Sequence, residues 1–203
     1  MLQRLWYVAY GTNLSRARFQ VYLHGGRPLG GARDYPGARD PLAPERDFGL
    51  MIPGGLRFLG ASSVWGGGLA VYDPRAAGEV AARAYLITAE QFVDVLAQEM
   101  RLQPGLAVDL APMQEARWHS YGPGCYQTVV SLGAREGLPM LTFTCAEVDD
   151  RPANPPSESY LRTMALGLRE SHGWTRSQIG AYLAGCPGAA GAWSPESISD
   201  IAA

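Results

Sequence analysis

The feature that most limits how this chain folds is a strand that leads directly into a helix near the N-terminus. Residues 5–10 read LWYVAY, an apolar run typical of a buried strand, and 16–23 read RARFQVYL, which is typical of a helix. Between them, Gly11 permits dihedral angles denied to other residues, while Thr12 and Asn13 favour turns and helix caps. Such a junction leaves backbone N–H groups unpaired at the positive end of a helix dipole. An anion or a developing oxyanion can bind there, although an ordinary strand-to-helix turn is the alternative.

Length and composition predict one globular domain. The chain has 203 residues, 47% of them hydrophobic and 18% charged, which argues against wholesale disorder. A net charge of −2 without a basic block gives no reason to expect nucleic-acid binding, so a small molecule is the expected partner and protein partners stay unknown. No apolar run is long enough to span a membrane and no secretory signal is evident, so we expect a soluble, cytoplasmic protein without membrane association.

The cysteines and histidines form no metal-binding or disulfide pattern. They are Cys125, Cys145, Cys186, His24, His119 and His172. An odd number of widely spaced cysteines without a CxxC pair predicts reduced thiols, and the scattered histidines predict no metal site. A nucleophilic pair made of Cys125 and His119 is a weaker alternative, because such pairs meet in space and closeness in sequence is no evidence for one.

Periodicity and turn signals place the remaining elements. Short apolar runs broken by glycines predict strands from residue 48 onward, and further strands are expected at 80–88, 125–133 and 138–145. Helices are expected at 14–24, from the cap Thr88 to Glu99, at 160–173 with Ser157 or Ser159 as the cap, and at 175–185.

These elements predict an α+β fold, with a mostly antiparallel sheet that is curled or closed into a small barrel and flanked by helices. Residues 1–186 would form the domain and residues 187–203 a small, polar C-terminal tail. The proline-rich stretch 30–47 reads as a surface excursion. Its arginines, Arg33, Arg39 and Arg46, either line a site for an anionic substrate or are solvated loop charges.

Three separated blocks resemble the gamma-glutamylcyclotransferase-like family. YVAYGTNL at 7–14 resembles its YGSN loop, WGGGLAVYDP at 65–74 followed by FVDVLAQEM at 92–100 resembles its middle section, and PPSESYLRTMALGLRESHGW at 155–174 resembles its C-terminal segment. The departures are Thr12 in place of serine, Met100 in place of glycine, an insertion between Glu99 and Tyr126, and the excursion at 30–47.

The resemblance implies an amine-releasing enzyme, an acyltransferase or lyase, that cyclises a γ-glutamyl group to 5-oxoproline. This reaction requires no metal, nucleotide or redox cofactor. Glu99 would be the general acid and base, in a partly apolar pocket that raises its pKa. The weaker candidates for this carboxylate are Glu90, Glu115 and Glu147.

The resemblance also implies the substrate-binding residues. They are Tyr10, Gly11, Thr12, Asn13, Leu14 and Tyr160. The loop N–H groups would hold the substrate carboxylate or the oxyanion, and Tyr160 would place a phenol near the carboxylate. Asn13 either donates to the substrate or holds the loop, and Tyr126 is a weaker candidate because the insertion precedes it.

Two other functions stay open. The same fold could be a non-catalytic module that binds a small molecule, or an amidohydrolase in which Glu99 activates water. The segments that depart from the family, at 30–47 and between Glu99 and Tyr126, are free to shape the side of the site that receives the leaving amine.

Overall fold

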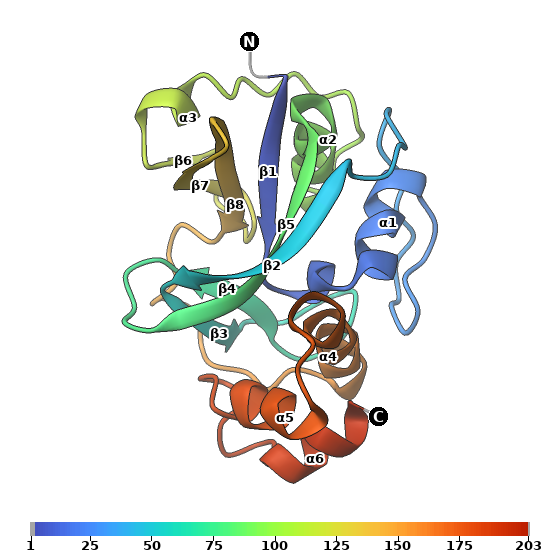
Figure 1. The fold of residues 1–203 in the computed structure, drawn as a ribbon, viewed down its shortest axis with the longest axis vertical. Coiled ribbons are helices and arrows are strands. Elements are labelled where there is room, and N and C mark those ends of the chain that lie inside the picture. The colour runs from blue at the N-terminus through green and yellow to red at the C-terminus, as the bar shows by residue number, and fades with distance from the viewer. Residues whose placement is uncertain (1–2, 203) are drawn as a thin grey trace.

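A computed structural model describes residues 3–202 and contains an open, six-stranded mixed sheet in the order β2-β5-β1-β8-β7-β6 (Figure 1). Its strands are β1 (Arg4–Ala9), β2 (Arg46–Pro53), β5 (Glu79–Thr88), β6 (Trp118–Ser120), β7 (Thr128–Arg135) and β8 (Leu138–Thr144). β1 and β8 are parallel, and the other pairs in this sheet are antiparallel. A separate hairpin consists of β3 (Gly55–Leu59) and β4 (Leu69–Asp73).

The α+β class with a mostly antiparallel sheet and flanking helices is confirmed, but the sheet is not closed. β2 and the short strand β6 are its two edges and do not pair with each other. A barrel requires such pairing between the first and last strands. The prediction that the sheet could close into a small barrel is therefore wrong.

The helices are the 3₁₀ turn η1 (Thr12–Leu14), α1 (Arg16–His24), α2 (Ala89–Glu99), α3 (Pro112–Glu115), α4 (Glu158–His172), α5 (Arg176–Ala184) and α6 (Pro195–Ile201). A serine or threonine side chain caps each of them except η1 and α3. Thr88 caps α2 as predicted, and Ser157 rather than Ser159 caps α4 by accepting from the Tyr160 N–H. Across residues 3–202, no helix combines the length and the apolar character needed to cross a membrane.

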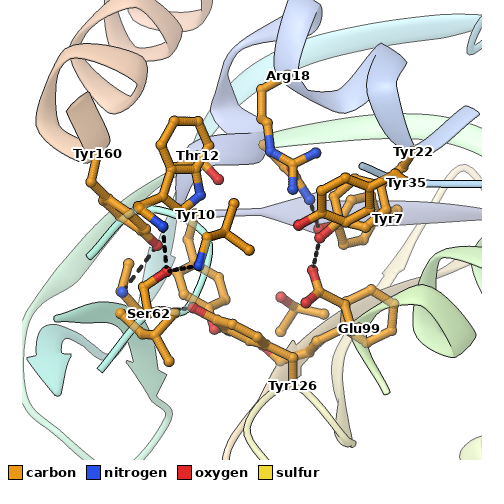
Figure 2. A pocket seen from close by; sticks show the side chains of 18 residues that line it. Tyr7, Tyr10, Thr12, Arg18, Tyr22, Tyr35, Ser62, Glu99, Tyr126 and Tyr160 are labelled. Atoms are coloured by element: carbon orange, nitrogen blue, oxygen red, sulfur yellow. Dashed lines mark hydrogen bonds between the residues drawn. The ribbon is translucent and has the colours of Figure 1, made fainter. Parts of the chain in front are cut away.

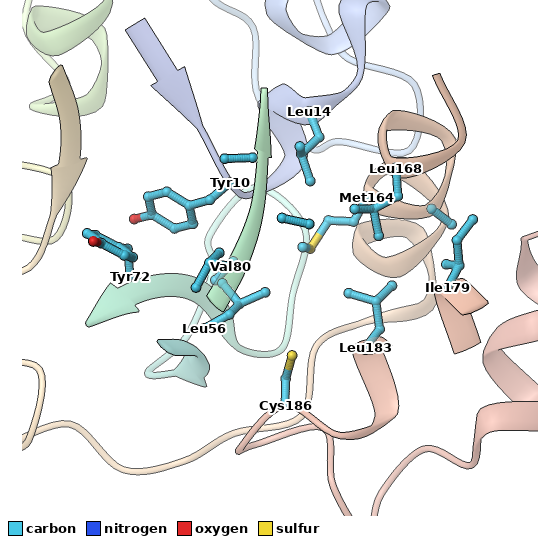
Figure 3. Close-up of a cluster of buried hydrophobic side chains, with 14 of the residues drawn as sticks. Tyr10, Leu14, Leu56, Tyr72, Val80, Met164, Leu168, Ile179, Leu183 and Cys186 are labelled. Atoms are coloured by element: carbon cyan, nitrogen blue, oxygen red, sulfur yellow. The ribbon is translucent and has the colours of Figure 1, made fainter. Parts of the chain in front are cut away.

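Two cores lie on the opposite faces of β1, because successive side chains of a strand alternate between faces. Trp6 and Val8 belong to the core that α4, α5 and α6 cover, part of which Figure 3 shows around Met164 and Leu183. Tyr7 and its alternating neighbours on β1 belong to the core beneath α1 and α2. The C-terminal end of β1 therefore lies where the two layers of helices meet.

The stretch read as a polar tail contains a helix. Ser194 accepts a hydrogen bond from the Ser197 N–H, and Pro195 occupies the first turn of α6, which is a favourable helix start. Ile198 and Ile201 lie three residues apart on one face and are buried in the same core as α4. The sequence analysis overlooked this helix because so few large apolar residues mark it.

Cys125 and Cys145 form a disulfide, so the expectation of reduced thiols is wrong for this pair. Thr128 pairs with Thr144 at the end of the β7–β8 hairpin, and the two cysteines lie just beyond that pair. The Cα atoms are 4.3 Å apart, within disulfide reach. Cys125 is therefore no free nucleophile for a pair with a histidine, while Cys186 is a buried free thiol.

Candidate functional site

The strand-to-helix junction opens onto a cavity in which six tyrosines converge (Figure 2). The hollow has about 540 Å³ of empty space, part of it open to solvent. The side chains used below are Tyr7, Tyr10, Arg18, Tyr22, Tyr35, Ser62, Val64, Trp65, Glu99, Tyr126 and Tyr160. They come from β1, α1, α2, α4 and the segments between elements, so only the folded chain brings them together. We call this hollow the tyrosine cavity.

Side chains of β5 hold the loop that follows β1 by hydrogen bonds to its carbonyl oxygens. The Tyr85 hydroxyl donates to the Asn13 carbonyl at 2.8 Å, and the Arg83 Nη1 donates to the Leu14 carbonyl at 2.9 Å. Arg83 is fully buried and also pairs with Glu170 at 2.8 Å. These bonds fix the loop rigidly, which a binding site requires of its backbone.

At its other end the loop has free donors. Within residues 3–202, the N–H groups of Gly11, Thr12 and Asn13 have no hydrogen-bond partner in the protein, and all three residues line the tyrosine cavity. The donors at the start of a helix carry partial positive charge. The junction thus has the unpaired N–H groups that the sequence predicted, and their role in binding stays a prediction.

Close packing of α4 sets the position of this loop. A Cβ atom on Gly167 would lie 2.4 Å from the Leu14 carbonyl carbon and 2.4 Å from the Ser15 nitrogen. Only a glycine lets the helix approach so closely. The Leu14 side chain is buried in the core beside α4 (Figure 3), and of the predicted loop residues it alone does not line the cavity.

Asn13 holds the loop internally. Its Nδ2 donates to the Tyr7 hydroxyl at 2.9 Å, and its Oδ1 has no partner among the described residues. Of the two roles that the sequence left open, the internal one therefore has a bond that supports it. Tyr7 lies on β1, and the sequence analysis did not select it.

Glu99 is the last residue of α2 and lies in the cavity opposite the loop. The Tyr22 hydroxyl of α1 donates a hydrogen bond to its Oε1. Burial raises the pKa of Glu99 above its usual value, whereas the Tyr22 bond and the charges of Arg18 and Arg33 oppose the rise. A carboxyl group with a raised pKa in a cavity is suited to accept and return protons near neutral pH.

Two buried polar residues that precede Glu99 on α2 fix its position. Gln98 donates to the Tyr22 carbonyl at 3.0 Å and so joins α2 to α1. Asp94 is fully buried and accepts from the Arg39 N–H at 2.8 Å and the Gly105 N–H at 2.9 Å. Asp94 thus anchors both segments that depart from the family pattern.

The weaker glutamate candidates lie outside the cavity. Glu90 has a side chain that is 51% exposed and pairs with Arg39 at 2.8 Å. Glu115 and Glu147 are exposed. Among the four glutamates considered, only Glu99 lines the tyrosine cavity.

The loop arginines chosen from the sequence also lie outside it. Arg39 pairs with Asp94 and Arg46 with Glu136, while Arg33 lies over the Tyr35 ring at 5.0 Å. The charge of Arg33 reaches Glu99, but none of the three lines the cavity. The arginine that does line it is on α1, and the sequence analysis had no signal for it.

The tyrosines beside β4 are locked by backbone groups. The Ala70 N–H donates to the Tyr160 hydroxyl at 3.1 Å, and the Tyr126 hydroxyl donates to the Ala70 carbonyl at 2.6 Å. Tyr10 donates to the Phe143 carbonyl at 2.8 Å. Burial raises the pKa of Tyr160 to about 12, so this phenol stays protonated and able to donate.

The sequence analysis missed a third wall of the cavity, between β3 and β4. Ser62 accepts from the Val64 N–H at 3.2 Å and the Trp65 N–H at 3.0 Å, which orders this loop. Trp65 begins the block 65–74 that resembles the known family, but nothing in the sequence marked it or Val64 as a cavity residue, so position in the fold alone reveals that role. Across residues 3–202, no group of three or more His, Cys, Asp or Glu side chains could hold a metal ion.

Comparison with known proteins identifies the fold. No protein-family model matches the chain. A crystal structure of an uncharacterized protein from Homo sapiens has a TM-score of 0.56 and 18% identity, and a solved gamma-glutamyl cyclotransferase has a TM-score of 0.52 and 16% identity; each match covers 98% of both chains. The chain therefore has a gamma-glutamyl cyclotransferase-like fold.

A curated relative is similar at the level of sequence. The chain is 32% identical to histone deacetylase 5 of Arabidopsis thaliana over 202 aligned residues, which cover 88% of this chain. The match spans only 30% of the length of that relative.

Proposed function

We propose that this chain is a gamma-glutamylcyclotransferase-type enzyme that converts a γ-glutamyl amide to 5-oxoproline and a free amine. The observation that carries the proposal is a single cavity in which the Glu99 carboxyl, with its raised pKa, lies with the unpaired N–H groups of residues 11–13. The similarity of fold to a solved gamma-glutamyl cyclotransferase supports the same reaction.

In the proposed reaction Glu99 removes a proton from the α-ammonium group of the substrate. The freed amine attacks the γ-carbonyl carbon, a C–N bond closes the five-membered ring, and the carbonyl electrons move to the oxygen. The N–H groups of Gly11, Thr12 and Asn13 stabilise that oxyanion. The intermediate then collapses, the bond to the leaving amine breaks, and protons from the attacking nitrogen pass through Glu99 to the leaving nitrogen.

The cavity favours cyclisation in a further way. Ring closure is already unimolecular, so the protein has chiefly to hold the substrate in a folded conformation. Buried tyrosines such as Tyr10 and Tyr160, fixed by backbone hydrogen bonds, form rigid walls for that purpose. Hydrolysis by a Glu99-activated water and binding without turnover are the alternatives.

The test is incubation of the whole chain with a panel of γ-glutamyl dipeptides, amides and isopeptides, followed by mass analysis of the products. We expect 5-oxoproline with an equal amount of free amine. Glutamate in place of 5-oxoproline would indicate an amidohydrolase. Tight binding of a panel member without either product would indicate a binding module.

A further inference from the structure

Arg18 presents a buried positive charge with unpaired hydrogen-bond donors to the tyrosine cavity. The residue is 4% exposed, and its Nε and Nη1 have no hydrogen-bond partner among residues 3–202. A buried cation that lacks partners is unfavourable, and buried donors in folded proteins are nearly always satisfied. A guanidinium that keeps free donors in a cavity is therefore suited to an anion that a ligand supplies.

Two aromatic rings pack against the Arg18 guanidinium. The Arg18 Cζ lies 4.2 Å from the centre of the Tyr22 ring and 4.5 Å from that of Tyr35. The two ring centres are only 4.8 Å apart, so both rings lie on one side of the guanidinium, where they partly compensate its charge. The N–H groups point outward in the plane of the guanidinium, so a ligand reaches them from the edge. A planar carboxylate matches this geometry.

Within residues 3–202, the charged side chains that line the cavity are those of Arg18 and Glu99. Tyr22 lies between the two charges, since its hydroxyl donates to Glu99 while its ring packs on Arg18 (Figure 2). One cavity thus holds a carboxylate and a guanidinium a short distance apart. The head group of an amino acid has the complementary pair, an ammonium and a carboxylate on one carbon atom.

We infer that Arg18 binds the α-carboxylate of the γ-glutamyl substrate while Glu99 receives the neighbouring ammonium, an inference that rests on the proposed function. In this assignment, different groups of the cavity bind the α-carboxylate and the γ-carbonyl oxygen of the substrate. The N–H groups of residues 11–13 are then free to serve the oxyanion at the γ-carbonyl, and the substrate carboxylate does not compete for them.

The kinetic test uses two substrates that differ only in the carboxylate. One is the γ-glutamyl amide that reacts best in the panel, and the other is the same amide of 4-aminobutanoic acid, which would cyclise to 2-pyrrolidinone. We expect the wild-type chain to prefer the first in kcat/KM by about 10- to 100-fold, the range for hydrogen bonds to charged groups. Arg18→Gln should abolish most of that preference by raising KM for the first substrate.

Arg16→Gln is the matched control, because it removes one positive charge from the same helix at an exposed side chain. It should keep the preference, and Arg18→Lys should keep part of it. If Arg18→Gln slowed both substrates equally and only moved the pH profile, Arg18 would act through Glu99 and the inference would be wrong. A wild-type chain without any carboxylate preference would overturn it whether or not the variants fold.

Product binding separates this inference from the proposed reaction. Calorimetry should show that 5-oxoproline binds the wild-type chain more tightly than 2-pyrrolidinone does, and that Arg18→Gln removes the difference. Carboxylate-dependent binding without any turnover would refute the reaction and keep the role of Arg18. Turnover that does not depend on the carboxylate would keep the proposed reaction and refute the role of Arg18.

Discussion

Tyr22 and Glu99 lie on different helices, α1 and α2, and the hydroxyl of the first donates a hydrogen bond to Oε1 of the second. Burial favours the neutral form of Glu99, whereas this bond favours the charged form. The pKa of Glu99 is raised because burial outweighs the hydrogen bond. Tyr22 thus limits how far the carboxyl departs from its usual pKa and holds it in one orientation.

Removal of that bond should move the pH dependence of turnover. Tyr22→Phe keeps the ring on Arg18 but takes away a donor that stabilises the carboxylate, so the pKa of Glu99 should rise further. The acidic limb of the profile of kcat/KM against pH should then move to higher pH. Tyr35→Phe is the control, because its ring also packs on Arg18 while Tyr22 supplies the bond to Glu99. An unchanged acidic limb in Tyr22→Phe would contradict this account.

The carboxyl itself should be indispensable. Glu99→Gln keeps the shape and a hydrogen-bonding oxygen but loses the proton acceptor, so kcat should fall by about 10²- to 10⁴-fold. The measurement is 5-oxoproline release by a variant whose circular dichroism matches the wild type. Glu90→Gln, an exposed change on the same helix, should stay near wild-type activity. Comparable losses in both variants would show that another carboxyl transfers the proton.

The same substitution should reveal a pH-dependent cost to stability. The pKa of Glu99 is raised in the folded chain, so the folded state holds this proton more tightly than the unfolded state does. Stability therefore falls as pH rises from the unfolded pKa through the folded one. We expect Glu99→Gln to unfold at higher denaturant concentration than the wild type at pH 7. The advantage should shrink or vanish below the unfolded pKa, and an advantage independent of pH would contradict the assignment.

Local sequence patterns predicted the secondary-structure elements around the site better than they predicted which side chains line it. Gly11, Thr12 and Asn13 predicted the junction after β1, and Thr88 predicted the start of the helix that ends at Glu99. Each of these signals lies within a few neighbouring residues, where dihedral preference and capping act. The sequence could therefore indicate the loop and the helix before any tertiary contact was known, whereas the choice of Glu99 rested on the resemblance to a known family.

The partners of Glu99 could not be found in this way. Arg18 and Tyr22 lie on a helix without a marked apolar stripe, and Tyr35 and Trp65 come from irregular segments. The sheet order brings these segments to one cavity, and strand order is not written in local periodicity. The disulfide was missed for the same reason, because its cysteines are 20 residues apart and only the pairing of β7 with β8 brings them together.

Loss of the disulfide should weaken the wall that contains Tyr126. The cysteines are 20 residues apart, and a loop of that length is stabilised by about 3 kcal/mol when it is closed. Cys145→Ser should lower the free energy of unfolding by about that amount and raise KM, because Tyr126 follows Cys125 directly and bonds to Ala70. Cys186→Ser changes a buried thiol away from the cavity and should leave KM unchanged. Equal KM values for all three chains would separate the disulfide from the site.

Selectivity for the leaving amine should depend on the loop between β3 and β4 more than on the insertion after Glu99. Val64 lines the cavity, and its carbonyl accepts from the Ala32 N–H at 2.8 Å, which ties the excursion at 30–47 to this loop. Residues 100–125 do not line the cavity. The expectation that both departing segments shape the amine side stays a prediction. Of the two, only the excursion at 30–47 lines the cavity itself, through Tyr35.

Val64→Ala should therefore change the ratio of kcat/KM between a γ-glutamyl amide with a bulky apolar amine and one with a small amine. The loss of one apolar contact is worth about 1–3 kcal/mol, so the ratio should change by about 10-fold or more while 5-oxoproline is still formed. Leu106→Ala, a truncation at an exposed position in the insertion, is the control and should leave the ratio unchanged. If the ratio responded to Leu106→Ala and not to Val64→Ala, the amine would be selected by the insertion. If both variants lost all substrates in proportion, neither segment would distinguish amines, because selectivity is a difference between transition states and a uniform loss leaves it intact.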